Sequence, residues 1–544
     1  MRPKTSAGRV RFIGIFWGLV FVVWLWIWTN PIPSRDDLLW ATRSGHAFGK
    51  TSLRSVLAST WDDLVDRNGR IADGAAQLIF STQGLIGPIM ALILTAFSVS
   101  VWALLRELVK IRARDDQAVP TVVRDLTMLV TAAMFVWVSV AHEPDYAEST
   151  VFFMSATIGY FGGSALLFAF LTLHTKLYSA RNTSGRRWNT WAALSVVLAI
   201  IGGLWNEIVG LVIFGFVSAT VVFSRGRTSR FRWYSVVVLV LSALRFLTPG
   251  LYSRSERVWQ PAVFDELSTL ERQLMLAIRA LVGMTNIQFI AVVMFAIAYS
   301  VYMWWESERF AQHTGLSRKI LCVQGVTTAL TLVVSRTINT NAQIATRADI
   351  EVVFCTKRTL VFLVLVSILA ALFVTQAVLL WRNHAHGIPA ALWILAPTAF
   401  ILPMYLGTPQ GRQTYFFLFF LLFTTAAVAF MYSPAISTQN PHAQGANYSA
   451  AACLLIFAAV VGPSFRAGYF TVTDYRINKA TWATFPAQVR EYKEGNISTI
   501  HLPREMPIKH SNGSYYIGEF ADAPELLGQY YDVPASAIVH ELQE

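Results

Sequence analysis

The sequence predicts an all-α polytopic membrane protein with a small α/β segment at its C-terminal end. Of its 544 residues, 54% are hydrophobic and only 14% are charged, whereas an ordinary soluble domain carries roughly 25% charged residues. The mean hydropathy is +0.47, and the apolar residues gather in stretches near the ~20 residues that a membrane-spanning helix needs. A soluble fold could not bury this much apolar surface.

About thirteen apolar stretches come near that length. The predicted spans are 11–29, 84–105, 123–141, 151–173, 190–203, 206–223, 233–248, 276–304, 319–335, 359–381, 388–406, 413–432 and 449–463. The first is predicted to be a retained helix, because it ends in Thr29-Asn30-Pro31 without the small residues of a signal-peptide cleavage site. Asn206 and Glu207 interrupt a longer apolar run, which favours two short helices there over one long helix.

Basic residues indicate the orientation of these spans. The chain has a net charge of +12, but its Lys and Arg residues cluster in alternate short loops rather than on one nucleic-acid-binding domain. By the positive-inside rule, the N-terminus is then cytoplasmic and the C-terminus extracytoplasmic. The partner that we expect is membrane lipid and not nucleic acid. The three cysteines are too scattered for a disulfide or zinc framework.

Two parts follow from this topology. Residues 1–463 form the transmembrane domain, with a first outer loop at 30–83, and residues 464–544 form an extracytoplasmic C-terminal domain. In the outer loop, the acidic segment from Trp61 to Arg70 predicts a re-entrant or interfacial helix. In the C-terminal domain, the spacing of Trp482, Phe485, Val489 and Tyr492 predicts a helix, and 497–502 and 514–519 are predicted strands.

Four acids are the candidate catalytic residues. Asp36 and Asp37 closely follow the first span, Glu143 lies in a short outer turn, and Glu207 divides two apolar runs. A charged residue such as Asp near the centre of a membrane helix costs about 2.5 to 3.5 kcal/mol, so such acids usually have a partner or a task. Solvated loop acids and a capped tight turn are the plainer alternatives.

Arginines of the same outer face complete the candidate site. Arg70, Arg254 and Arg412 could each hold a phosphate through paired hydrogen bonds. An acid beside arginines at the lipid–water boundary suits transfer of a sugar from a polyprenyl phosphate. The acid would take the proton of an acceptor hydroxyl, and arginine, with or without a divalent cation, would stabilise the departing phosphate. Asp36 and Asp37 would be the ligands of such a cation, Mg²⁺ or Mn²⁺.

Several short motifs carry a resemblance to a known family. Asp36-Asp37 after the first span, Asn68-Gly69-Arg70 before the second, Asn206-Glu207 between short helices and Pro249-Gly250 leading to Arg254 resemble the pattern of bacterial GT-C type membrane glycosyltransferases. The branch most similar is that of the O-antigen glucosyltransferase-like proteins. The resemblance implies a bacterial plasma membrane, a polyprenyl-phosphate sugar donor and a cell-envelope glycan or glycolipid acceptor. It also implies Asp36 or Asp37 as catalytic base or metal ligand, and inverting transfer on the outer face.

Other functions share parts of this pattern. A transporter or flippase of lipid-linked sugars also uses acids and arginines, but it usually places them near the bilayer midplane and has repeated halves, which this sequence lacks. A polysaccharide polymerase or ligase shares the donor and the side of the membrane. A non-catalytic scaffold would tolerate replacement of both Asp36 and Asp37.

Overall fold

The computed structural model describes part of the chain. The described residues are 6–29, 31–42, 52–67, 70–80, 85–112, 129, 132, 154–180, 185–223, 228–249, 268, 270–271, 314–335, 337–338, 356–382, 469, 472–503 and 520–540. The predicted spans 276–304, 388–406, 413–432 and 449–463, nearly all of 123–141, and the predicted strand 514–519 lie outside these residues.

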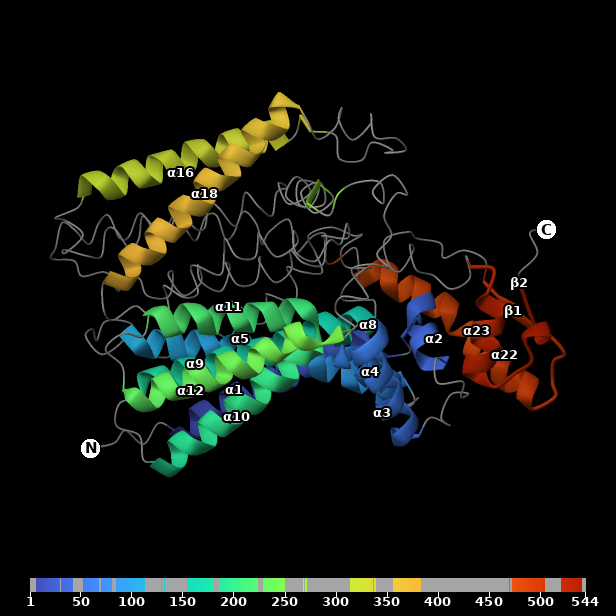
Figure 1. Cartoon of the computed structure of the whole chain (residues 1–544). Coiled ribbons are helices and arrows are strands. Elements are labelled where there is room, and N and C mark those ends of the chain that lie inside the picture. Colours follow the sequence, from blue (N-terminus) through green and yellow to red (C-terminus); the bar gives the residue numbers. More distant parts are fainter. Residues whose placement is uncertain are drawn as a thin grey trace.

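Within the described residues the protein is mostly helical, and its largest unit is a bundle of long apolar helices (Figure 1). The bundle consists of α1 (Ser6–Ile27), α5 (Ile86–Arg112), α9 (Gly163–Ser179), α10 (Gly185–Trp205), α11 (Glu207–Phe223) and α12 (Ser229–Ala243). Each of these helices packs against the next in the series. The helix α9 continues from α8 (Met154–Ala156) through a π-helix, η3 (Thr157–Gly162).

Four described segments are long and apolar enough to cross a membrane: Gly8–Ile27, Ile86–Glu107, Met154–Ser179 and Gly185–Trp205. The prediction of two helices on either side of Asn206 is confirmed, because α10 ends at Trp205 and α11 begins at Glu207. Further along the chain, α16 (Thr314–Ser335) packs against α18 (Lys357–Arg382).

Aromatic rings and a set of hydrogen-bonded polar side chains lie in the bundle core. The ring of Phe97 on α5 meets the rings of Phe161 and Phe168 edge-on. The hydroxyl of Tyr234 on α12 lies 2.5 Å from Ser195 Oγ on α10 and 3.2 Å from His174 Nδ1 on α9. Hydrogen bonds of this kind join helices that gain little hydrophobic energy from associating in lipid.

The predicted first outer loop is helical in most of its described residues and lies at the end of the bundle away from the N-terminus (Figure 1). It contains α2 (Arg35–Thr42), α3 (Leu53–Asp62), a π-helical turn η1 (Asp63–Arg67) and α4 (Ile71–Phe80). Ser52 caps α3 by accepting a hydrogen bond from the backbone N–H of Ser55. The short helices pack on one another and, through α4, on η3 and α10.

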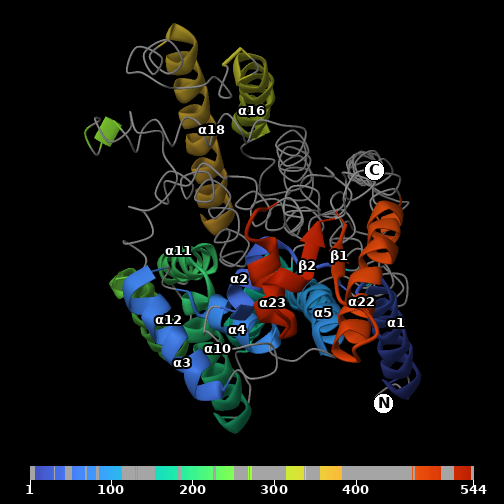
Figure 2. The ribbon, with the colours of Figure 1, turned by 90° about the vertical axis from the view of Figure 1, so that its right-hand side faces the viewer.

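Residues 472–503 and 520–540 form a C-terminal unit at this same end (Figure 2). They comprise a helix at 472–482, α22 (Thr484–Lys493), β1 (Ile500–Leu502), α23 (Ala523–Tyr531), η9 (Ala535–Ala537) and β2 (Ile538–His540). The two strands are parallel, with Ile500 opposite Ile538. The helix predicted from Trp482 to Tyr492 is confirmed from Thr484 onward, whereas Trp482 ends the preceding helix, and β1 covers the last three residues of the predicted strand 497–502.

Polar contacts attach the C-terminal unit to the start of the first outer loop. Arg35 donates to both carboxylate oxygens of Asp522, with Nη2–Oδ2 at 2.6 Å and Nε–Oδ1 at 3.0 Å. The same guanidinium lies over the ring of Phe520, 5.0 Å from its centroid. Lys479 Nζ donates to Thr29 Oγ1 at 2.8 Å. The unit is therefore held against both α2 and the end of α1.

Candidate functional site at one end of the bundle

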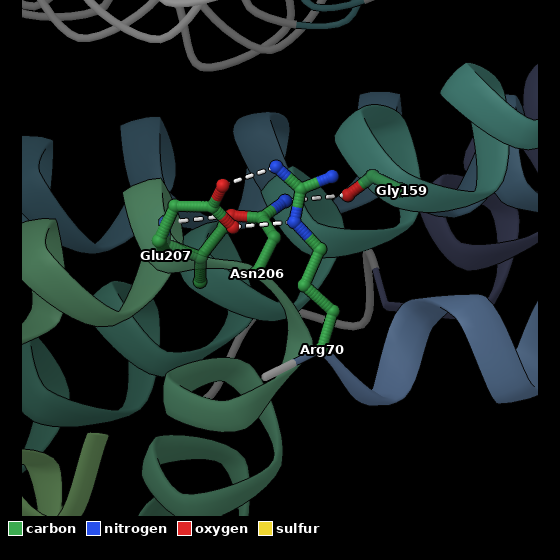
Figure 3. Close-up of polar contacts among 5 residues, drawn as sticks. Arg70, Gly159, Asn206 and Glu207 are labelled. Carbon is green, nitrogen blue, oxygen red and sulfur yellow. Dashed lines mark hydrogen bonds and ion pairs between the residues drawn. The ribbon is translucent and has the colours of Figure 1, made fainter. Parts of the chain in front are cut away.

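Asn206 shapes the junction between α10 and α11. Its Oδ1 accepts a hydrogen bond from the backbone N–H of Val209 at 2.9 Å, as an N-cap side chain does. Its Nδ2 donates to the carbonyl oxygen of Gly159 in η3 at 2.7 Å (Figure 3). One amide thus starts α11 and joins it to the π-helix, which places Glu207 at the end of the bundle.

Glu207 forms a two-pronged ion pair with Arg70. The Nε and Nη2 groups of Arg70 donate to the two carboxylate oxygens of Glu207 (Figure 3). The two residues are 137 positions apart in the chain, and their side chains are only 16% and 5% exposed. Glu207 was predicted as a candidate catalytic acid and Arg70 as a phosphate-binding residue, and the structure brings these two residues together.

The surroundings of Arg70 favour its protonated, positively charged form. Burial acts to lower the pKa of Arg70, but the charge and hydrogen bonds of Glu207, with smaller contributions from Tyr160 and Asp73, raise the pKa overall. Two of the five guanidinium N–H groups donate to Glu207, and among the described residues the other three have no hydrogen-bond acceptor, so they can serve one such as a phosphate. The arginine is thus fixed in place and still has donors.

Asp37 is buried, with 1% of its surface exposed, and joins two helices. Its Oδ2 accepts from the backbone N–H of Ser34 at 2.9 Å, while Ser34 Oγ accepts from the backbone N–H of Asp37 at 3.2 Å. This reciprocal pair is a capping box at the start of α2. The Oδ1 atom accepts from the backbone N–H of Ser155 at 2.8 Å and from its hydroxyl at 2.5 Å. A single carboxylate therefore caps α2 and fastens it to α8.

Burial raises the pKa of Asp37 to about 6, although the hydrogen bonds from Ser155 and Ser34 act to lower it. The C-terminal unit takes part in this environment, because Tyr475 and Tyr530 lie near enough for the charge of Asp37 to act on them. Burial is the largest cause that raises the pKa of both phenols, and the charge of Asp37 raises it further. Asp37 thus lies where α2, α8 and the C-terminal unit meet.

The hydrogen bonds of Asp37 bear on its predicted role as a metal ligand. Both of its oxygens face N–H or O–H donors from Ser34 and Ser155, and a cation would have to displace them. No group of three or more His, Cys, Asp or Glu residues that could hold a metal occurs among the described residues. Asp37 as arranged here does not fit a metal site.

Other predicted site residues have no described surroundings. Asp36 is the second residue of α2, and its side chain is not described. Glu143, Arg254 and Arg412 lie outside the described residues. Of the seven predicted residues, the structure therefore gives the surroundings of Asp37, Arg70 and Glu207.

Several partners of these residues were not predicted from the sequence. The spacing Ser34-x-x-Asp37 is a capping-box pattern that could have been recognised. The link from Asp37 to Ser155 and the ion pair from Arg35 to Asp522 cross long stretches of chain and have no local signal.

Comparisons of the chain with protein-family models, with curated proteins and with solved structures found no match.

Proposed function

We propose that this protein is a membrane glycosyltransferase of the GT-C kind, with thirteen spans and an extracytoplasmic α/β domain. It moves a sugar from a polyprenyl-phosphate donor to a cell-envelope glycan or glycolipid on the outer face of a bacterial plasma membrane. One observation supports this proposal above the rest. Asp37, Arg70 and Glu207 come from separate parts of the chain and lie at the same end of the helix bundle.

The distribution of basic residues supports an outer position for this end. Arg186 and Arg187 lie in the first turn of α10, whereas Glu207 follows the last residue of that helix. A helix of 21 residues separates its ends by about 30 Å at 1.5 Å per residue. The described cations Arg106 and Lys176 likewise occur late in α5 and α9, two helices whose first residues lie at the Glu207 end. The positive-inside rule makes the arginine-rich end cytoplasmic.

The residues would divide the chemistry as follows. Asp36 is the preferred base that takes the proton from the acceptor hydroxyl, because the hydrogen bonds of Asp37 to Ser34 and Ser155 assign it to holding α2 in place. Arg70 stabilises the charge on the departing phosphate with its remaining N–H groups, and Glu207 fixes the direction of the guanidinium.

Further groups complete the proposal. Glu143 supports acceptor orientation, and Arg254 and Arg412 supply further phosphate contacts. A divalent cation, if the reaction uses one, would need Asp36 and ligands other than Asp37.

The test is sugar transfer by the purified protein in liposomes. The liposomes receive polyprenyl-phosphate monosaccharides and extracted cell-envelope acceptors, and the parent is compared with Asp36→Asn, Asp37→Asn and the control Asp62→Asn. Asp62 is an exposed acid of α3, in the same loop. We expect Asp36→Asn to abolish transfer without loss of the folded fraction, Asp37→Asn to lower both, and Asp62→Asn to change neither.

The same assay separates the alternatives. If the parent consumes no donor while labelled lipid-linked sugar crosses the bilayer, the protein is a transporter and the proposal is wrong. Addition of many sugars to one acceptor would indicate a polymerase. Full transfer by a folded variant that lacks both Asp36 and Asp37 would exclude these acids from catalysis.

A further inference from the structure

The helix α3 has an exposed apolar stripe. Leu53, Leu57 and Trp61 are 61%, 60% and 67% exposed, and they recur at every fourth residue, so they lie on one side of the helix. Residues advance by roughly 100° around a helix, which places all three within about 80° of one another. Three large apolar side chains on one helix face are costly to leave in water.

A second side of α3 packs on the protein. Val56 is buried, Ser59 Oγ accepts a hydrogen bond from Gln77 Nε2 at 3.0 Å, and Thr60 lies so close to Gly74 that an added Cβ would meet its Oγ1 at 1.8 Å. The packing on α4 fixes the rotation of α3. The outward direction of the apolar stripe is therefore set by the fold.

The third side of α3 is polar or small and exposed. Ala58 and Asp62 are exposed and lie roughly 140° around the helix from Leu53 and Leu57, respectively. Arg54 is exposed as well and flanks the apolar stripe. A long arginine side chain beside such a stripe can reach lipid phosphates while its stem stays in the apolar layer.

The placement of α3 identifies what covers the stripe. The helix lies at the periphery of the bundle end and runs across the direction of the long helices (Figures 1 and 2). A helix that is perpendicular to membrane-spanning helices and has one apolar face lies in the plane of the interface. Tryptophan is enriched at this depth. We propose that α3 is an interfacial anchor whose face of Leu53, Leu57 and Trp61 is embedded in the lipid leaflet at the site end of the bundle.

The anchor bears on the candidate site through the chain. From Asp62 the backbone continues through η1, whose residue Asp63 is buried, and reaches Arg70 within eight residues. The depth of α3 in the lipid thus determines the position of the segment that leads to Arg70, the partner of Glu207. The proposal concerns a membrane contact and does not require that the protein transfers sugar.

Site-directed spin labelling tests the proposal. In a background with Cys322, Cys355 and Cys453 replaced by serine, a nitroxide is attached at Leu57→Cys or at the control Asp62→Cys. The full chain is reconstituted in phosphatidylethanolamine–phosphatidylglycerol nanodiscs. Power saturation then compares collisions with oxygen, which concentrates in lipid, and with a water-soluble nickel chelate.

We expect the label at position 57 to collide several-fold more with oxygen than with nickel, and the label at position 62 to show the reverse. Leu53→Cys and Ala58→Cys form a second pair with the same expectation, in case a member of the first pair does not fold. If both labels of a folded pair collide equally often with the nickel chelate, the proposal is wrong. A label at position 57 that neither reagent reaches would also overturn it, because protein would then cover the stripe.

Discussion

The ion pair between Arg70 and Glu207 makes the most direct prediction. Glu207→Gln keeps the size of the side chain but removes the charge that offsets burial of the guanidinium. Breaking a buried ion pair by removing one partner costs about 3 to 5 kcal/mol. The Arg70 side chain keeps 16% exposure and the nearby carboxylate of Asp73, so we expect the lower end of this range, about 3 kcal/mol.

The control is the removal of both charges together. Replacement of a buried pair by apolar residues of similar volume is often neutral in stability, so Arg70→Met with Glu207→Met should recover most of the lost free energy. Asp66→Asn neutralises an exposed acid in the same loop and should change stability by less than about 0.5 kcal/mol. The assay is reversible unfolding in mixed micelles at increasing SDS fraction, followed by circular dichroism.

Two outcomes would refute the reasoning about this pair. A loss below about 1 kcal/mol in Glu207→Gln would mean that the pair is hydrated like a surface salt bridge. A double variant as unstable as the single variant would mean that the contacts of each side chain matter more than their charges. If the stable double variant also transfers sugar at the parent rate, Arg70 does not stabilise the departing phosphate.

Three further predictions concern the same end of the bundle. Burial raises the pKa of Asp37 from 3.8 to about 6, so the folded state holds this proton more tightly than the unfolded state. The free energy of unfolding should then fall by about 3 kcal/mol in total as the pH rises from about 3 to 7, with about 2 kcal/mol of the fall between about pH 4 and 6, and Asp37→Asn should remove that slope in a pH series of unfolding curves. Arg35→Gln breaks a partly exposed pair and should cost about 0.2 to 1 kcal/mol, less at high salt, with faster proteolysis of the C-terminal unit as the measurement. At Gly87 an added Cβ would meet the carbonyl oxygen of Trp28 at 2.5 Å, whereas at Gly18 it would meet nothing within 4 Å. Gly87→Ala should therefore lower the free energy of unfolding by about 1 to 3 kcal/mol, and Gly18→Ala should not lower it.

The described helices of the bundle could be predicted from the sequence because their signal is local. Hydropathy alone marks the four described membrane-length segments. The break at Asn206 could be predicted as well, since a short amide next to an acid disrupts an apolar run and suits a helix N-cap. The helix from Thr484 to Lys493 was predicted from the spacing of its aromatic and aliphatic residues.

The contacts of the candidate site could be predicted only in part. Nothing near Arg70 in the sequence points to Glu207, 137 residues later, because their meeting depends on how α4 packs against η3 and α10. The strand β2 was missed for a different reason. Its three residues, Ile538–His540, are too few to show an alternating pattern, and the strand is stabilised by its parallel pairing with β1.

The polar contacts of the described residues also explain why this end of the bundle can hold a site. Lipid offers helices little hydrophobic gain on association, so hydrogen bonds and close packing determine how they are arranged. At the end near Glu207, such contacts join α2 to α8 through Asp37, α11 to η3 through Asn206, the first outer loop to α11 through Arg70, and α2 to the C-terminal unit through Arg35.

The contacts of Asp37, Arg70 and Arg35 each span a long stretch of sequence, so together they fix the first outer loop from several directions. Groups that must act on one substrate need this kind of support, because small errors in their positions greatly reduce the rate. At the opposite end, Arg106, Lys176 and Arg230 lie over aromatic rings on neighbouring turns or helices. Those contacts suit cations that anchor a membrane protein at its interface. Under the proposed function, substitutions in the first outer loop, rather than at the arginine-rich end, should therefore affect sugar transfer without moving the spans.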